Sequence, residues 1–226
     1  MNMAERAISD IAPADKEARF ADALTSDLLA GKYSPGEWLK QSDLEETYSA
    51  NRFEVRIALA ELSVRGLLEH LPNRGYRVCK HTAEDWEQLL ELRSLLEVAA
   101  CRLVVQRAAE DRIAEFERLV NAFDKATDDG NPDVMRETNY ELHNVFYGMT
   151  GNAMLAEQIR DLRERGMPGR RGLWDARKSV RDSNDDHFEM LEALKRRDAD
   201  GLAAAVYRHL NRWRKSSRPA TARDRD

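Results

Sequence analysis

The sequence has few cysteines, no long apolar run near its start and no overall excess of positive charge. Cys79 and Cys101 are the only cysteines among 226 residues, and no ligand spacing links them, so we expect neither a disulfide framework nor a thiolate metal site. Residues 1–20 carry acidic side chains and no apolar core, which predicts no secretory signal, no membrane partner and a cytoplasmic location. A net charge of −5 argues against indiscriminate nucleic-acid binding and favours a localised basic face.

Length and composition predict a mainly helical protein of two domains. A chain of 226 residues exceeds the usual size of one domain, and 42% hydrophobic residues can fill a core in each of two. We place the first domain at residues 12–80 and the second at residues 82–216. Residues 217–226 end a segment rich in Arg, Ser, Pro and Ala, and we expect them to form a disordered tail.

A helix with two distinct faces is predicted to begin at Asn51. The Asn51 side chain can cap the following backbone N–H groups, and Glu54, three residues on, can complete a capping box. Arg52 and Arg56 lie one turn apart on one face. The apolar face consists of Val55, Ala58, Leu59 and Leu62. The helix therefore separates a core-facing surface from a contact surface.

A second helix and a hairpin are predicted on either side of this helix. Ser42, which precedes acidic residues, is predicted to cap a shorter upstream helix. Downstream of Gly66, two short strand-like stretches are separated by a Pro-Asn-Arg-Gly turn at residues 72–75. The order helix, turn, helix and hairpin is an arrangement that places one helix in a DNA groove and a basic loop beside it.

Positive charge gathers in this segment. Residues 51–80 hold six Arg or Lys and three Glu, and six minus three gives a local net charge of +3 in an acidic chain. Taken alone, Arg52 and Arg56 would more often only solvate an exposed helix face, but the local charge favours contact with DNA. Arginine can bind guanine O6 and N7 through two hydrogen bonds or hold a phosphate, and both uses stay open.

The segment resembles the winged helix-turn-helix of the GntR family of bacterial transcription regulators over residues 15–80. Where that family usually reads Ser-Arg-Thr-Pro-Val-Arg, this chain reads Asn-Arg-Phe-Glu-Val-Arg at residues 51–56, which keeps both arginines and replaces the Thr-Pro pair. The Asn-Arg-Gly turn of the family stands unchanged at residues 73–75. The resemblance implies binding to double-stranded operator DNA. The residues expected to contact DNA are Lys40, Asn51, Arg52, Phe53, Arg56, Asn73, Arg74 and Gly75.

Helical patterns without strand signals fill the rest of the chain. Thr82, followed by Glu84 and Asp85, is predicted to start a helix whose apolar stripe extends to Val104. Further helices are predicted at about residues 111–128, 132–149, 152–165, 172–197 and 199–215. Breaks that contain Gly, Pro, Asn or Asp separate them. Six such helices predict an antiparallel bundle.

Three histidines occupy positions that are predicted to face the interior of the bundle. His143, His187 and His209 each stand among apolar residues at helical spacing, and Asn139 lies four residues before His143. One helix then projects two ligands from one face, and two further helices can complete a metal site. A lone histidine on such a face is more often a hydrogen-bonded core residue. Three of them on different helices weaken that interpretation.

This region also resembles the FCD effector-binding domain found in the FadR and VanR branches of the same family, over residues 82–215. The resemblance implies a divalent metal ion, zinc or nickel, held by Asn139, His143, His187 and His209, with Asn139 standing where the family has aspartate. Three imidazoles and an amide leave the charge of such an ion uncompensated, so an anionic ligand such as a carboxylate is favoured.

Arg93 places a charge on the apolar stripe of the first bundle helix. It matches an arginine in the Glu-Leu-Arg run that opens the domain in related proteins, which implies contact with the effector. A charge that points inward needs a partner. An internal salt bridge to Glu97, four residues on, explains the position equally well, and both interpretations stay open.

Together the patterns predict a transcriptional regulator of the repressor type that binds its operator as a homodimer and responds to a small organic acid. We expect a homodimer because two recognition helices, one from each copy, would read half-sites about one helical turn apart. The alternatives are a metal-dependent hydrolase built on the bundle and a regulator whose metal is purely structural. We expect no enzyme, because no HExxH motif, Ser-His-Asp order or paired catalytic carboxylates accompany the histidines.

Overall fold

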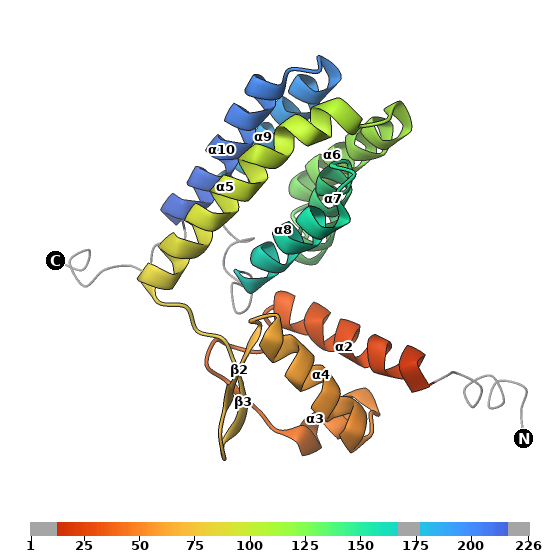
Figure 1. The fold of residues 1–226 in the computed structure, drawn as a ribbon, viewed down its shortest axis with the longest axis vertical. Helices are drawn as coiled ribbons and strands as arrows, with labels where there is room; N and C mark the ends of the chain where they lie inside the picture. The colour runs from red at the N-terminus through yellow and green to blue at the C-terminus, as the bar shows by residue number, and fades with distance from the viewer. Residues whose placement is uncertain (1–12, 167–176, 217–226) are drawn as a thin grey trace, which may run out of the picture. The chain divides into compact units, whose positions relative to one another are not determined.

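The computed structural model describes residues 13–166 and 177–216, and these divide into two compact units between Lys80 and His81 (Figure 1). The first unit combines helices with a three-stranded sheet, and the elements described in the second are helices. The protein is therefore mainly α, as the sequence predicts. The predicted tail, residues 217–226, lies outside the described residues. Among the helices that are described, none is both long and apolar enough to cross a lipid bilayer.

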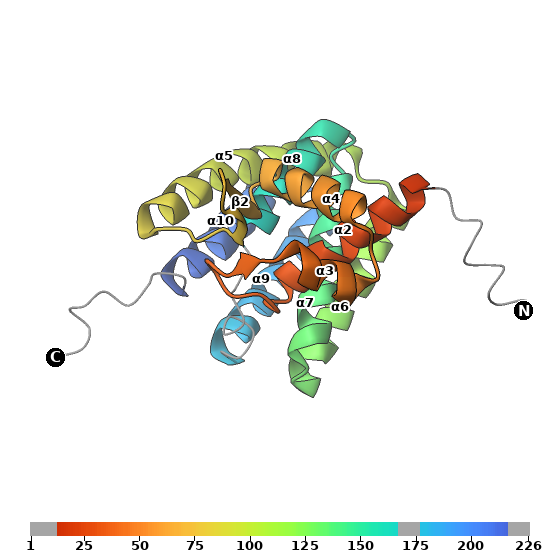
Figure 2. The same cartoon turned by 90° about the horizontal axis from the view of Figure 1, so that it is seen from below.

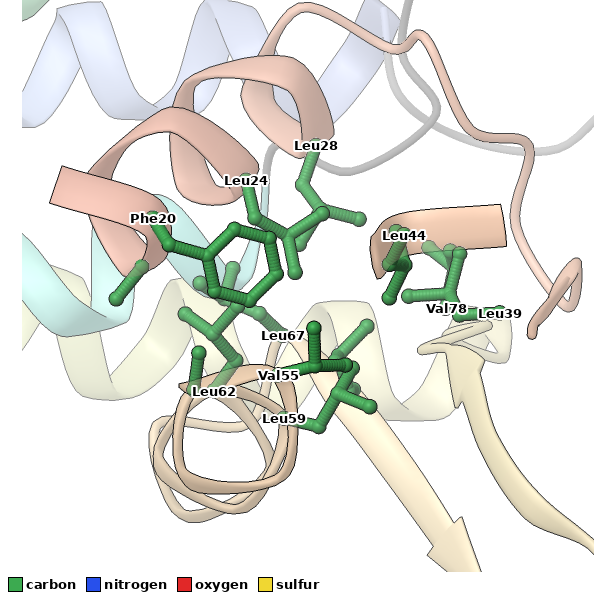
Figure 3. Packing of buried hydrophobic residues seen from close by; sticks show 13 residues of the cluster. Phe20, Leu24, Leu28, Leu39, Leu44, Val55, Leu59, Leu62, Leu67 and Val78 are labelled. Atoms are coloured by element: carbon green, nitrogen blue, oxygen red, sulfur yellow. The ribbon is translucent and has the colours of Figure 1, made fainter. Parts of the chain in front are cut away.

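Three helices surround one apolar core in the first unit. They are α2 (Pro13–Leu29), α3 (Gln41–Tyr48) and α4 (Arg52–Val64). Phe20 and Leu24 of α2 point toward Leu62 of α4 within this core (Figure 3). Burial of each large apolar side chain contributes about 1.5–3 kcal/mol. The sequence does not predict α2, because apolar side chains recur at helical spacing only in its second half.

The start of α4 is fixed by its cap. The Asn51 carboxamide oxygen accepts hydrogen bonds from the backbone N–H groups of Phe53 and Glu54 at 2.9 and 3.0 Å. The Glu54 carboxylate accepts in return from the Asn51 N–H at 2.7 Å. The predicted capping box is therefore confirmed. Such a cap contributes about 1 kcal/mol, and it sets the first residue of the helix at Arg52.

The predicted cap of the preceding helix is wrong. α3 begins at Gln41, with Lys40 in the capping position and no side-chain hydrogen bond there. The Leu44 N–H bonds the Lys40 carbonyl at 3.1 Å, so Ser42 already lies inside the first turn. The Ser42 hydroxyl donates instead to the Asp43 carboxylate at 3.0 Å. The helix exists as predicted, but its end is set by backbone hydrogen bonds alone.

A small antiparallel sheet completes the first unit. β2 (Leu68–Leu71) and β3 (Gly75–Val78) form the predicted hairpin, and β1 (Trp38–Leu39) pairs with the other edge of β3. Asn73 and Gly75 at the turn have φ angles of 61° and 95°, a region that these residue types tolerate. The sequence does not predict β1, because two residues carry no periodicity and the strand forms only by pairing with β3.

The described part of the second unit consists of helices that pack against one another (Figures 1 and 2). They are α5 (Ala83–Arg107), α6 (Glu110–Asp129), α7 (Pro132–Gly148), α8 (Ala153–Arg165), α9 (Arg177–Lys195) and α10 (Ala199–Ser216). The predicted bundle is confirmed. The predicted helix start after Thr82 is also confirmed, and the structure shows that a capping box of Thr82 and Asp85 fixes it. Residues 172–176, the start of the fifth predicted bundle helix, lie outside the described residues. α9 packs against α6 and α10, and α10 also packs against α5, so the core joins elements far apart in the chain.

Candidate metal centre and nucleic-acid interface

Three buried histidines from three helices meet inside the second unit. His143 of α7, His187 of α9 and His209 of α10 are at most 3% exposed. One ring nitrogen of each lies within 4.8 Å of the others, and the Nε2 atoms of His143 and His187 are 3.3 Å apart. The inward positions that the sequence assigns to these residues thus converge on one point.

Burial favours the neutral form of these imidazoles. Desolvation lowers the pKa of His143 and His187 well below the ordinary value of 6.5 and lowers the pKa of His209 as well. The positive charge of Arg163 acts in the same direction on all three, while Asp186 opposes it at His209. A neutral imidazole offers a ring lone pair, which is the form that binds metal ions.

Asn139 provides a fourth possible metal ligand, one turn before His143 on α7. Its side chain is 7% exposed, and its carboxamide oxygen accepts no hydrogen bond from any residue that the structure describes. A buried oxygen without a partner costs about 1–3 kcal/mol, and coordination to a cation would remove that cost. Three imidazoles and an amide oxygen suit zinc and the neighbouring divalent transition metals. The residues present therefore fit a metal ion.

A carboxylate that the sequence analysis does not identify lies behind His209. Asp186 is fully buried, and its Oδ2 is 3.6 Å from Nδ1 of His209. Arg208 and Arg212 pair with the same carboxylate at 3.0 and 2.9 Å. Burial would raise the pKa of Asp186, but His209 and the two arginines hold it below its ordinary value. A carboxylate near Nδ1 favours the tautomer that carries the proton on Nδ1, which leaves the Nε2 lone pair available to bind a metal ion. Two arginines one turn apart around His209 are the sequence signal for such a partner.

A second buried charge network adjoins the histidines. Glu97 is 1% exposed and pairs with Arg93 at 2.7 Å and with Arg163 at 3.3 Å. It also accepts a hydrogen bond from the Tyr147 hydroxyl at 2.5 Å. The Tyr147 ring stacks on His143, with centroids 6.2 Å apart and planes 12° from parallel. One carboxylate between two guanidinium groups leaves one positive charge unbalanced within this network, beside neutral imidazoles.

The sequence predicts one of the two arginines of this network as a site residue but not the other. Arg93 forms the salt bridge to Glu97, which is one of its two predicted roles. Arg163 is not predicted, because Arg160 and Arg165 flank it on α8 with similar chemistry. Its burial follows from the packing of α8 against α5, which no local pattern specifies.

The predicted DNA-contact residues of the first unit are exposed on α4 and just before α3. Arg52 and Arg56 are exposed and form no ion pair with another described residue. Phe53 between them is 65% exposed. The Asn51 carboxamide oxygen is used by the helix cap, so its NH₂ group remains for contact with DNA. Lys40 is exposed at the start of α3.

The arginine at the hairpin turn is held over an aromatic ring. The Arg74 guanidinium lies 4.7 Å from the centre of the Trp38 ring, and that of Arg77 lies 5.8 Å from it. Arg77 also pairs with Glu69 across the hairpin at 2.7 Å. Contacts of this kind contribute about 0.5–1 kcal/mol at exposed sites and restrict the positions of the guanidinium. Trp38 is therefore a candidate that the sequence analysis misses, since its place depends on the pairing of β1.

Comparisons with known proteins match both units. The family model for bacterial regulatory proteins of the gntR family matches residues 16–78, and the FCD domain model matches residues 88–212, more than half of the chain. The Nta operon transcriptional regulator of Aminobacter aminovorans is 28% identical over 180 residues, which cover 80% of this chain and 84% of that protein. McbR of Escherichia coli K12 is 25% identical over 180 residues, 79% of this chain and 81% of that protein. The repressor GlaR of the same strain is 22% identical over 196 residues, 83% of this chain and 89% of that protein.

Solved structures share the fold. E. coli McbR/YncC aligns with a TM-score of 0.79 at 23% identity, over 87% of this chain and 93% of that chain. A GntR regulator from Rhodococcus sp. RHA1 aligns with a TM-score of 0.74 at 20% identity, over 89% of this chain and 97% of that chain. At these identities the likeness establishes the fold, a helix-turn-helix unit followed by a helical bundle.

Proposed function

The chain belongs to the gntR family of bacterial regulatory proteins and carries an FCD domain, and from this premise we propose that it is a repressor whose operator affinity changes when a small carboxylate binds beside a divalent metal ion. It is a transcriptional regulator and not an enzyme, since both families and the similar proteins are regulators. The name of GlaR supports the repressor assignment. The proposal rests on one observation: four buried side chains that can bind a metal ion lie beside an unbalanced positive charge.

The metal ion, zinc or nickel, would be held by Asn139, His143, His187 and His209. When bound, it would supply a Lewis-acid anchor for a carboxylate oxygen. Asn139 adds no negative charge, so the ion would be held less tightly than by an aspartate but would keep its full charge for an anionic ligand. Asp186 would act behind His209, where its negative charge would favour the tautomer with the proton on Nδ1.

The effector would meet positive charge from Arg93 and Arg163. Both guanidinium groups share Glu97, so an entering carboxylate would supply the second anion that the pair lacks. A small organic acid satisfies this requirement and fits a site lined by neutral imidazoles. It would change DNA binding only if it binds the DNA-competent and DNA-incompetent states with different affinity.

The first unit would bind operator DNA as one half of a homodimer. α4 would enter the major groove with Arg52, Phe53 and Arg56, while Lys40 and the turn at residues 73–75 would contact the backbone nearby. Two copies related by a twofold axis would read half-sites roughly 34 Å apart. Such a regulator acts in the cytoplasm, where bacterial DNA lies.

Replacing His187 with alanine should remove the metal ion and the response to acids together. Wild-type protein should contain about one metal ion per chain, and one member of a library of small carboxylates should change its affinity for an operator fragment at least about fivefold. His187→Ala should lose both effects and still bind DNA without acid, because the DNA contacts belong to the first unit. Elemental analysis and fluorescence anisotropy measure the two properties.

Asn139→Asp is the matched variant for this experiment. A carboxylate in the same position adds a charged ligand, so the variant should hold the metal ion more tightly against a chelator and keep the acid response. Wild-type protein that carries no metal ion and responds to no acid would contradict the proposal. Stability that depends on metal without any acid response would also contradict it, and would assign the ion a purely structural role.

Replacing Trp38 with leucine should weaken operator binding about 2–5-fold, because the loss of the aromatic ring frees the Arg74 guanidinium before DNA binds. Leucine keeps apolar bulk in β1, so the fold should be retained. Arg74→Ala should weaken operator binding as well. It should also reduce, by about one, the number of counterions released on binding, as measured from the salt dependence of the affinity. In the Arg74→Ala background the change at Trp38 should have no further effect. Additive losses in this double-mutant cycle would instead assign Trp38 a role independent of Arg74.

A further inference from the structure

The outward face of α4 carries apolar side chains, although a face exposed to water usually carries polar ones. Phe53 and Ile57 are 65% and 38% exposed, and Ala60 is exposed as well. Steps of four and three residues keep these three on one face of the helix, here called the α4 stripe. Val64, the last residue of α4, continues the same line and is 82% exposed. Exposed apolar side chains that gather in this way mark a contact surface.

The α4 stripe faces away from the core of the first unit. Val55, Leu59 and Leu62 of the same helix are fully buried and point into that core (Figure 3). At 3.6 residues per turn, these three lie on the side of α4 opposite the α4 stripe. The backbone N–H of Phe53 donates to the Asn51 side chain at 2.9 Å, which holds the start of the stripe in place. The stripe is therefore a fixed apolar surface that the core of its own unit does not cover.

Positive charge borders the α4 stripe on one side. Arg52 directly precedes Phe53 in the chain, and it is exposed. Arg56 directly precedes Ile57 and is exposed too. One position along a helix is a rotation of about 100°, so a partner must be apolar opposite the stripe and anionic beside it. The major groove of duplex DNA meets both conditions, because phosphates line its edges and the C5-methyl groups of thymines lie on its floor.

The side chains of the α4 stripe have no hydrogen-bond donor or acceptor. Phe53 and Ile57 therefore cannot distinguish base pairs by the donor and acceptor pattern of their edges. Among the four bases of DNA, only thymine presents a methyl group in the major groove, and apolar side chains contact it there. Residues near the N-terminus of a recognition helix are the ones that reach base edges. Both side chains lie in the first half of α4, which begins at Arg52.

We propose that Phe53 and Ile57 contact the C5-methyl groups of thymines in each half-site of the operator, beside the contacts of Arg52 and Arg56. The assignment rests on the operator binding proposed above and names bases that the operator must contain. The arginines supply attraction to DNA, and the two apolar side chains supply a preference for A·T pairs at fixed positions. Four residues of a helix rise about 6 Å, so the two thymines should lie within about two or three base pairs of each other.

Replacing thymine with uracil in the bound DNA tests the proposal, because deoxyuridine lacks only the methyl group and keeps every hydrogen bond. The probes are duplexes that the full chain selects from a pool of random sequence. The selected duplexes should hold thymines at the same positions of both half-sites. Uracil at one such position should lower the affinity about fourfold per methyl group, as measured by fluorescence anisotropy. Thymines elsewhere in the duplex should tolerate the same exchange without loss.

Alanine variants assign each methyl group to a side chain. Phe53→Ala should bind the selected duplex more weakly and become indifferent to uracil at one position, while it stays sensitive at the other. Ile57→Ala should show the reverse pattern. Both side chains are exposed and alanine favours helices, so circular dichroism should show an unchanged fold. Val64→Ala is the control, because Val64 lies about 16 Å along the helix from Phe53, and it should keep the affinity and both uracil responses of wild type.

Two outcomes would overturn the proposal and leave operator binding intact. In the first, the selected duplex binds equally well with uracil in place of each thymine. In the second, the loss caused by uracil persists unchanged in Phe53→Ala and Ile57→Ala, so that the methyl groups act through other residues or through the shape of the DNA. Wild-type protein that selects no duplex from the pool would contradict operator binding itself.

Discussion

Replacing Glu97 with glutamine should lower the free energy of unfolding of the helical unit by about 3–5 kcal/mol. The Glu97 side chain is 1% exposed and balances Arg93 and Arg163, whose side chains are 11% and 16% exposed. Glutamine keeps the size of the side chain but removes its charge, so two guanidinium groups stay buried without an anion. Urea unfolding followed by far-ultraviolet circular dichroism measures the change.

The same variant should lose part of the pH dependence of stability. Burial alone would raise the pKa of Glu97, but Arg93 and Arg163 hold it below its ordinary value of 4.5. Because the folded pKa is the lower one, the contribution of the carboxylate is complete above pH 4.5 and is lost as the pH falls through the folded value. Wild-type protein should therefore lose more stability in acid than Glu97→Gln does.

Glu157→Gln on α8 is the matched control for this change. The Glu157 side chain is 61% exposed and lies 3.7 Å from Arg160. Its replacement should change the free energy of unfolding by no more than about 0.5 kcal/mol. If Glu97→Gln were as stable as this control, the favourable interactions of the buried network would do no more than offset the cost of removing its charges from water.

Local signals predict the elements whose ends depend on nearby residues. The capping box at Asn51, the helix start after Thr82 and the hairpin turn at residues 72–75 all form as predicted, because each needs only residues within about one turn. Ser42 satisfies a capping pattern equally well, yet the helix begins earlier because β1 ends at Leu39 and the chain turns directly into α3. The position of β1 depends on a partner strand far along the chain, which the local pattern does not contain.

The sequence predicts the histidines of the candidate site but not the charged residues that surround them. Helical periodicity places His143, His187 and His209 on inward faces, and inward faces of a bundle must meet. The contacts of Asp186 with α10 and of Arg163 with Glu97 join separate helices, and periodicity does not specify which buried charges pair. These contacts decide the balance of charge in the site, so the proposed preference of the site for anions could be inferred only from the packing.

Arg52→Ala and Arg56→Ala should each reduce affinity for the operator about 10–100-fold, which makes α4 the element on which DNA binding depends most. Both side chains are exposed one turn apart, and the cap at Asn51 fixes the start of the helix that carries them. Arg196→Ala is the control, because it removes the same charge from an exposed position in the second unit. It should leave affinity within about twofold of wild type. Fluorescence anisotropy with labelled operator measures all three variants.

The pattern of loss across DNA sequences identifies the role of each arginine. An arginine that reads guanine forms two hydrogen bonds through its planar guanidinium, so its loss should reduce operator binding far more than binding to unrelated DNA, and lysine should not restore it. An arginine that holds a phosphate should reduce both by similar factors and lower the salt dependence by about one counterion, and lysine should restore part of the affinity. Unchanged operator affinity in both alanine variants would exclude this face of α4 from the interface, and contact would then have to come from Lys40 and the hairpin turn.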